Sequence, residues 1–210
     1  MGVACLILGA SGSGKSTSLR NFKEGEVGIF NVASKPLPFR SNLKTADGAD
    51  YDTIMKRLED NGLNDDDPIR TFVIDDSQYL MVFDDFRRAK DTGYTKWSEM
   101  ALSFYNLVQC AIMRTNPNTI VYFLHHVDID EDGRTKAKTV GKLLDAKLVL
   151  EGLFSVVLLA GTDGTDYWFE TQNDGHTTVK SPMGMFEDKR IPNDLAAVDA
   201  AIREYWRLEK

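Results

Sequence analysis

The sequence predicts an α/β fold in which a mostly parallel β-sheet carries helices on both faces. Continuous apolar runs recur along the chain, and the first, residues 3–8, is ended by glycine, a pattern typical of strands buried on both faces. Residues 96–114 carry apolar side chains at helical spacing, which predicts a long helix. Residues 9–14 are too rich in glycine to form a regular element, so they are expected to join the first strand to a helix.

The first half of the chain is expected to contain three strands and two helices. In chain order these are strand 3–8, helix 15–22, strand 27–32, helix 51–61 and strand 71–74. Ile54 and Leu58 fall on one face of the second helix. Pro36 and Pro38 predict that residues 34–50 form a long surface connection.

The second half is expected to add two buried strands, a hairpin and an antiparallel extension. The long helix is ended by an Asn-Pro-Asn turn, and the strand after it, residues 119–124, is followed by two histidines. An Asp-Gly pair at 132–133 predicts a hairpin that leads into a helix. The last elements expected are a fifth strand, its antiparallel partner and a helix capped by Asn193 or Asp194, at residues 154–160, 167–171 and 193–208.

Length and composition favour one domain, residues 1–210, built on one core. The chain has 210 residues, of which 42% are hydrophobic, and this is short for two independent cores. Cys5 and Cys110 lie in apolar runs and are expected to be buried thiols in a reducing compartment. The sequence shows no secretion signal or membrane span, so a cytoplasmic protein without a membrane partner is expected. The formal charge of −7 argues against nucleic-acid binding over the whole surface and leaves a local basic strip as the alternative.

A glycine-rich loop with a lysine and a serine follows the first strand. Residues 9–16, Gly-Ala-Ser-Gly-Ser-Gly-Lys-Ser, match G-x-x-x-x-G-K-[ST] at every fixed position, which identifies a P-loop. The glycines let main-chain N–H groups surround a polyphosphate, and the N-terminus of the next helix adds its dipole. Lys15 is expected to reach the β- and γ-phosphates and Ser16 to ligate Mg²⁺. The nucleotide-binding residues expected are Gly9, Ser11, Gly12, Ser13, Gly14, Lys15, Ser16 and Thr17.

Polar residues that follow two later strands complete the expected site. Asp75 ends a buried strand and is expected to hold Mg²⁺ from the side opposite Ser16. Asp76 is expected to orient or deprotonate the attacking water, with a solvated turn acid as the alternative. His126, preferred over His125, is expected to sense the γ-phosphate, with a local hydrogen-bonding role as the alternative. ATP is the expected nucleotide because no guanine-reading Asn-Lys-x-Asp motif is present.

The P-loop, the Val-Ile-Asp-Asp strand end and the histidine-ended fourth strand together resemble the RecA-like branch of P-loop ATPases. More narrowly, the sequence resembles small phage-encoded AAA-type ATP-binding proteins, relatives of phage single-strand annealing ATPases with a RecA-like core. The matching segments are residues 9–17, 72–77, 123–126 and 138–142. The resemblance covers most of the chain, but only the first two segments are specific enough to carry chemistry.

The resemblance implies a sheet of strand order 5-1-4-3-2 and a homo-oligomer that binds ATP at its subunit boundaries. A basic residue would then reach across from a neighbour, with Lys142 chosen for this role and Lys147 in reserve, against a solvated helix lysine as the alternative. It also implies that the segment after the fourth strand meets DNA, which would involve Arg134, Lys136 and Lys138, against a solvated charged hairpin. The partners implied are single-stranded DNA and phage recombination or replication proteins in the bacterial host cytoplasm.

The sequence departs from the RecA pattern in two places. RecA proteins carry a catalytic glutamate just after the second strand, but residues 31–35 contain no acid, so either Asp76 takes that role or hydrolysis is slow. The first strand begins almost at Met1, which leaves no N-terminal polymerisation segment and puts RecA-like filaments in doubt.

Three functions remain open from the sequence. The leading one is a P-loop ATPase whose cycle regulates binding to single-stranded DNA in phage recombination or replication. The first alternative is a small-molecule or nucleotide kinase, whose lid would have to be formed by Arg87, Arg88 and Lys90. The second alternative is an ATP-dependent switch that binds a protein partner and hydrolyses little.

Overall fold

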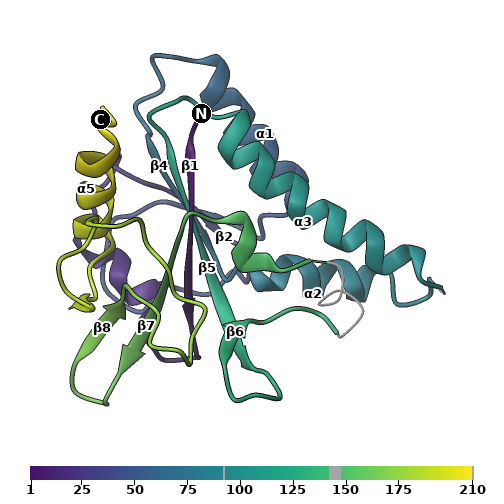
Figure 1. The fold of residues 1–210 in the computed structure, drawn as a ribbon. Coiled ribbons are helices and arrows are strands. Elements are labelled where there is room, and N and C mark those ends of the chain that lie inside the picture. The colour runs from purple at the N-terminus through teal and green to yellow at the C-terminus, as the bar shows by residue number, and fades with distance from the viewer. Residues whose placement is uncertain (92, 142–147, 210) are drawn as a thin grey trace.

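The computed structural model describes residues 1–91, 93–141 and 148–209. In these residues the elements alternate between strands and helices through most of the chain (Figure 1). Their bounds are β1 Val3–Gly9, η1 Ser16–Asn21, β2 Gly28–Asn31, β3 Thr45–Asp47, α1 Tyr51–Leu63, β4 Thr71–Asp75, α2 Gln78–Arg87, α3 Thr95–Met113, β5 Ile120–Ile129, β6 Thr135–Ala137, η2 Leu150–Leu153, β7 Val156–Thr162, β8 Tyr167–Glu170, β9 Arg190–Pro192 and α5 Leu195–Trp206.

The sheet is parallel in its centre and antiparallel at one side. Its strand order is β3-β2-β4-β5-β1-β7-β8-β9, and β6 pairs with β5 outside this path. All pairings from β3 to β7 are parallel, whereas β8 and β9 add antiparallel strands beyond β7. The five strands expected from the sequence therefore lie in the order 5-1-4-3-2, as β7-β1-β5-β4-β2, and this RecA-like order, with its antiparallel extension, is confirmed.

Two hydrophobic clusters cover the two faces of the sheet. In β1, Ala4, Leu6 and Leu8 pack on the face covered by α1, α2 and α3, while Cys5 and Ile7 pack on the face covered by α5 and η1. Figure 1 shows these two groups of helices on opposite sides of the central strands. Because both faces are covered, β1 needs apolar side chains at every position, which explains its continuous apolar run.

The structure adds elements that the sequence did not reveal. β3 lies within the predicted connection, and β9 is a three-residue strand that contains a proline. Both are short strands with exposed residues, so neither carries the alternation of a half-buried strand. α2 was also missed, since it starts immediately after the acidic strand end and has no side-chain cap.

The helix expected after the P-loop is shorter and tighter than predicted. Residues 16–21 form a six-residue 3₁₀ helix, η1, in place of an α-helix over 15–22. The Ser18 hydroxyl donates to the carbonyl of Lys15 at 2.6 Å, and such serine bonds compete with α-helical pairing. The helix dipole expected at the phosphate loop is correspondingly smaller.

The fourth strand does not end before the histidines as expected, because β5 runs through them to Ile129, whereas three other predictions are met in the described residues. The hairpin at 128–133 joins β5 to β6, α5 is capped by Asp194, and Cys5 and Cys110 are buried free thiols. The helix expected after the hairpin falls partly on residues 142–147, which lie outside the described residues. No helix in the described part of the chain is long and apolar enough to cross a membrane.

Candidate nucleotide-binding site

A cavity of about 340 Å³ opens at the carboxyl ends of the central strands. One wall is the loop after β1, and its lining residues there are Ser11, Gly12, Gly14, Lys15, Ser16 and Thr17. The other lining residues come from the segment after β2, the end of β4, and strands β5 and β8, and they are Lys35, Pro36, Pro38, Asp75, Asp76, His126 and Tyr167. The parallel register explains this assembly, because it pairs Gly9 with His126 and Asn31 with Asp75.

The loop itself has the backbone that an anion cradle requires. Gly12 and Gly14 have φ angles of 79° and 90°, which residues with a side chain rarely adopt. A Cβ on Gly14 would also lie 2.7 Å from Cδ1 of Tyr167, so glycine is required there for space as well. Among the hydrogen bonds of the described residues, none gives the main-chain N–H of Gly12, Gly14, Lys15 or Ser16 a protein acceptor. These donors fit a polyphosphate.

Lys15 is held at the base of the cavity by the loop's own carbonyl groups. Its Nζ donates to the carbonyl oxygens of Gly9 at 2.7 Å and Ala10 at 2.9 Å, and the residue is 6% exposed. Burial lowers the pKa of Lys15 to about 8, and the charges of Asp76 and Asp75 oppose this change. The lysine is therefore still mostly cationic at neutral pH, with one of its three N–H donors left for a ligand.

Ser16 and Asp75 meet across the cavity. The Ser16 hydroxyl donates to Oδ1 of Asp75 at 2.8 Å, although the two residues are 59 positions apart. Burial raises the pKa of Asp75, and the hydrogen bond from Ser16 partly offsets that effect. A hydroxyl and a carboxylate fit Mg²⁺, which usually binds proteins through few side chains and keeps several waters. No cluster of three or more acidic, cysteine or histidine side chains able to hold a metal occurs in the described ranges.

Asp76 stands beside Asp75 in a strained backbone conformation and is engaged on both carboxylate oxygens. Its φ is 59°, in the left-handed region. Oδ2 forms an ion pair with Lys35, and Oδ1 lies 3.1 Å from Nε2 of His126. Burial would raise the pKa of Asp76, but the hydrogen bonds with His126 and Lys35 outweigh burial and lower it to about 2. In this arrangement Asp76 is a poor proton acceptor near neutral pH.

The two histidines at the end of the fourth predicted strand lie in different environments. His126 lines the cavity and touches Asp76, as expected for the preferred candidate. His125 is fully buried behind the cavity, with Nδ1 at 2.9 Å from the Ser77 hydroxyl and Nε2 at 2.8 Å from the carbonyl of Lys138. Burial lowers the pKa of His125 to about 4, so it is neutral at physiological pH.

Some predicted site residues lie elsewhere. Gly9 and Ser13 do not line the cavity; a Cβ on Gly9 would lie 2.3 Å from the Ser13 hydroxyl, which is buried without a partner in the described structure. Arg134, Lys136 and Lys138 lie on or beside β6 and do not line the cavity, although the N–H of Lys138 donates to the carbonyl of His126. Lys142 and Lys147 fall outside the described residues.

The arginines considered for a kinase lid are tied to neighbouring helices. Arg88 pairs with Asp84 at 3.5 Å and with Glu99 of α3 at 2.7 Å, and neither Arg87 nor Arg88 lines the cavity. The structure therefore gives no support to a lid formed by this segment.

Four residues that line the cavity were not predicted as site residues, and these are Lys35, Pro36, Pro38 and Tyr167. Lys35 follows β2, so its place at the carboxyl edge was accessible from the strand prediction. Tyr167 begins β8, and only the folding of the β7–β8 hairpin brings it against Gly14.

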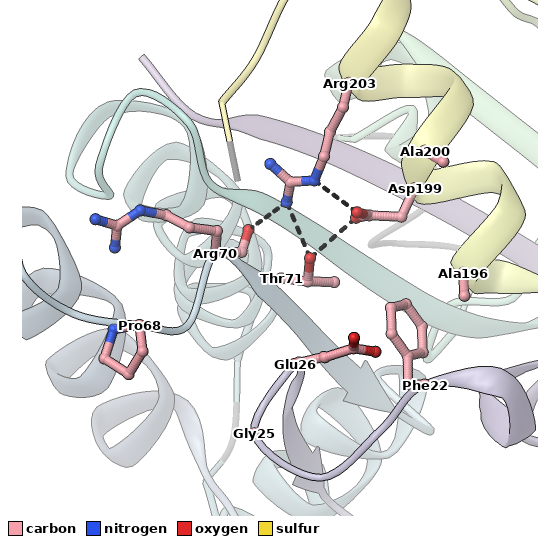
Figure 2. Close-up of a pocket in the computed structure, with 10 residues that line it drawn as sticks. All are labelled: Phe22, Gly25, Glu26, Pro68, Arg70, Thr71, Ala196, Asp199, Ala200 and Arg203. Carbon is pink, nitrogen blue, oxygen red and sulfur yellow. Dashed lines mark hydrogen bonds and ion pairs between the residues drawn. The ribbon is translucent and has the colours of Figure 1, made fainter.

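A second cavity, of about 250 Å³, lies at the amino ends of the strands (Figure 2). Arg203 of α5 donates there from Nε to Asp199 at 2.6 Å and from Nη2 to the Thr71 hydroxyl and the Arg70 carbonyl, each at 2.9 Å. Its Nη1 donates to the carbonyls of Asn118 and Glu209. Asp199 in turn accepts hydrogen bonds from Thr71 and Tyr122.

Comparison with known proteins yields little. No protein-family model and no curated protein matches the chain. Among solved structures, the chain is similar to one described as a DnaB-like replicative helicase with its interactions with primase, at 10% identity and a TM-score of 0.46. The match covers 86% of this chain and 57% of that one, so the chain spans little more than half the length of that structure.

Proposed function

We propose that this protein binds a nucleoside triphosphate, with ATP as the expected one, together with Mg²⁺, and hydrolyses it. The observation that carries the proposal is the 2.8 Å hydrogen bond between Ser16 and Asp75, with Lys15 in the same cavity. A hydroxyl, a carboxylate and an ammonium therefore lie beside a loop in which several N–H groups have no protein acceptor in the described structure. That set of groups suits a polyphosphate and its magnesium ion.

Each residue would have a distinct task. The N–H groups of the loop and the ammonium of Lys15 would bind phosphate oxygens, and Ser16 and Asp75 would hold the magnesium ion. When bound, the ion would supply positive charge to the phosphates. Asp76 and His126 lie beside these groups and would orient the attacking water.

Replacing Lys15 tests nucleotide binding directly. Lys15→Ala is expected to weaken binding of Mg²⁺ with a non-hydrolysable ATP analogue by roughly 100-fold, because a charge-assisted hydrogen bond is lost in a buried site. Isothermal titration calorimetry measures this. Lys23→Ala, at an exposed lysine just beyond η1, is the matched control and should bind as the wild type does. Equal affinity of Lys15→Ala and wild type would contradict the proposal.

The proposed action on single-stranded DNA rests on the β5–β6 hairpin. Lys136 lies in β6, and Arg134 and Lys138 flank this strand directly on either side. Asp128 lies directly opposite Lys136 in the ladder, which reduces the positive potential at that point. The two basic ends, Arg134 and Lys138, are exposed.

A salt series tests the DNA proposal. ATP hydrolysis is measured with and without single-stranded DNA at two salt concentrations. Stimulation that falls steeply with salt and disappears in Lys136→Ala/Lys138→Ala would support binding through this hairpin. Phosphate transfer to an added nucleotide would instead favour a kinase. If DNA leaves the rate of ATP hydrolysis unchanged, the proposed action on single-stranded DNA is wrong.

One observation favours a second candidate, a switch that hydrolyses little. Asp76 is the expected water-activating residue, yet both of its carboxylate oxygens are engaged and its pKa is lowered to about 2. Asp76→Asn separates the two candidates. A large loss of turnover would support hydrolysis through Asp76, whereas unchanged slow turnover would support the switch.

A further inference from the structure

Lys35 lies in the segment that follows β2, four residues after the strand ends at Asn31. It lines the cavity together with Lys15 and Asp75. Its ammonium forms the ion pair with Asp76 and lies 5.4 Å from the centroid of the Tyr79 ring. Lys35 therefore lines the same cavity as the expected phosphate cradle and pairs with the carboxylate expected to orient water.

The main chain of Lys35 is fixed, while its side chain can change partner. Asn31, 4% exposed, donates from Nδ2 to the carbonyl of Lys35 at 2.8 Å, and its Oδ1 accepts from the N–H of Lys35 at 3.2 Å. Pro36 follows and restricts the chain further. The Lys35 side chain, in contrast, is 60% exposed, so its ammonium can move without loss of core packing.

The charges around the cavity favour such a movement. Two lysines and two aspartates line it, so their formal charges balance in the structure. Lys15 is already committed to two main-chain carbonyls, whereas Asp76 is the one ionic partner of Lys35 within the described part of the chain. A phosphate group carries more negative charge than a carboxylate and offers more acceptor oxygens, so it competes well for an exposed ammonium.

We propose, on the basis of the nucleotide binding proposed above, that Lys35 is a second phosphate-binding lysine that exchanges Asp76 for the terminal phosphate of a triphosphate. Lys35 then distinguishes a triphosphate from a diphosphate, because only the longer chain of phosphates extends to it. After the exchange Asp76 keeps its contact with His126 but loses Lys35. The carboxylate oxygen that Lys35 released can then accept a hydrogen bond from a water. The hydrolytic residue is thus exposed only when a triphosphate is bound.

Binding measurements on the full chain test this inference. Affinity for a non-hydrolysable ATP analogue and for ADP, each with Mg²⁺, is measured by calorimetry for wild type, Lys35→Met and Lys35→Arg. Lys35→Met is expected to weaken the analogue roughly 10- to 100-fold and ADP by less than about threefold, and Lys35→Arg should recover most of the loss. Equal losses for both nucleotides, or none for the analogue, would overturn the proposal.

A matched control lies in the same segment. Lys44 has a side chain that is 87% exposed, pairs with Glu24 at 3.3 Å and does not line the cavity. Lys44→Met removes the same charge and should leave both affinities unchanged. A loss in Lys44→Met as large as in Lys35→Met would show a general electrostatic effect and would count against a specific contact.

A double variant separates phosphate binding from simple neutralisation of Asp76. If Lys35 only neutralises Asp76, removing both charges in Lys35→Met/Asp76→Asn restores affinity for the analogue, and the inference is wrong. If Lys35 binds phosphate, the double variant stays weak. Circular dichroism confirms that each variant is folded.

The two proposals fail in different ways. A wild-type protein that binds neither nucleotide overturns both the proposed function and this inference. A wild-type protein that binds both nucleotides, with Lys35→Met indistinguishable from it, overturns the inference alone.

Discussion

The two cavities at opposite ends of the sheet use similar charged residues in different ways. At the amino ends, the guanidinium of Arg203 donates five hydrogen bonds, and Asp199 accepts from three groups. Figure 2 shows the bonds that join Arg203, Asp199, Thr71 and Arg70. At the carboxyl ends, Lys15 retains a spare donor, and within the described residues the N–H groups of Gly12, Gly14, Lys15 and Ser16 lack protein acceptors. The first cavity is internally satisfied, whereas the second is prepared for a ligand.

This difference separates stability from function within one sheet. A buried charge with every partner in place fixes the element that carries it, here α5 against the starts of β4 and β5. Spare donors in a cavity stabilise little by themselves and gain partners only when a ligand enters. Substitutions at the two ends should therefore affect different measurements.

The largest effect is expected at the satisfied end. Arg203→Ala leaves Asp199 as a buried, unpaired carboxylate and should lower the free energy of unfolding by about 3–5 kcal/mol. Urea unfolding measures the loss, and nucleotide affinity should be unchanged while the variant is folded. Glu204→Ala, at an exposed position of the same helix, is the control. If Arg203→Ala lost nucleotide affinity but kept normal stability, the proposed separation of the two cavities into a stabilising one and a ligand-binding one would be wrong.

A smaller, pH-dependent effect is expected from His125, which is buried behind the ligand cavity. Its pKa in the folded protein is about 4, below the usual value near 6.5. Between these values the unfolded chain binds a proton that the folded protein does not, so the free energy of unfolding falls as pH drops from about 6.5 to about 4. The total loss is on the order of 3 kcal/mol.

The His125 contribution can be isolated by substitution. In His125→Asn, the slope of stability against pH between about 6.5 and 5 should flatten, because the variant lacks the proton uptake of His125 and unperturbed carboxylates titrate below this window. Urea unfolding at several pH values gives both slopes. The same slope in wild type and variant would show that His125 is not the group responsible.

The smallest effect is expected at the N-terminal cap of α5, which lies between the two cavities. Asp194 caps α5 by accepting from the N–H groups of Ala196 and Ala197, and it also accepts from Asn21 near the P-loop at 2.7 Å. Asp194→Ala should cost about 1 kcal/mol of stability, and Asp194→Ser should cost less. Thermal unfolding measures both, and equal losses would argue against a capping role.

The sequence predicted the centre of the fold better than its edges. Strands such as β1 and β4 are covered on both faces, so their uninterrupted apolar residues identify them. β3 and β9 are three-residue strands, and η1 is set by serine side chains that compete with α-helical bonds. In these segments local chemistry and tertiary pairing outweigh any periodic pattern.

Within the site, the sequence identified groups with a fixed spacing and missed those placed by tertiary structure. The P-loop residues and Asp75 were predictable because glycine, lysine and a strand-ending acid stand in a recognisable order. His126 was predicted as a site residue, but its contact with Asp76 was not, and neither was the ion pair from Lys35 in the loop after β2. Only the register of the sheet brings these side chains together.

The dispersed origin of the site also bears on how the chain folds. Ser16 and Asp75 are 59 residues apart, and they meet only when β1, β5 and β4 are paired in register. A ligand that needs both groups would bind the native chain alone, and at 100 times its dissociation constant it would raise the unfolding free energy by about 2.7 kcal/mol. During refolding, the appearance of ligand binding would therefore mark the moment at which these long-range strand pairings are complete.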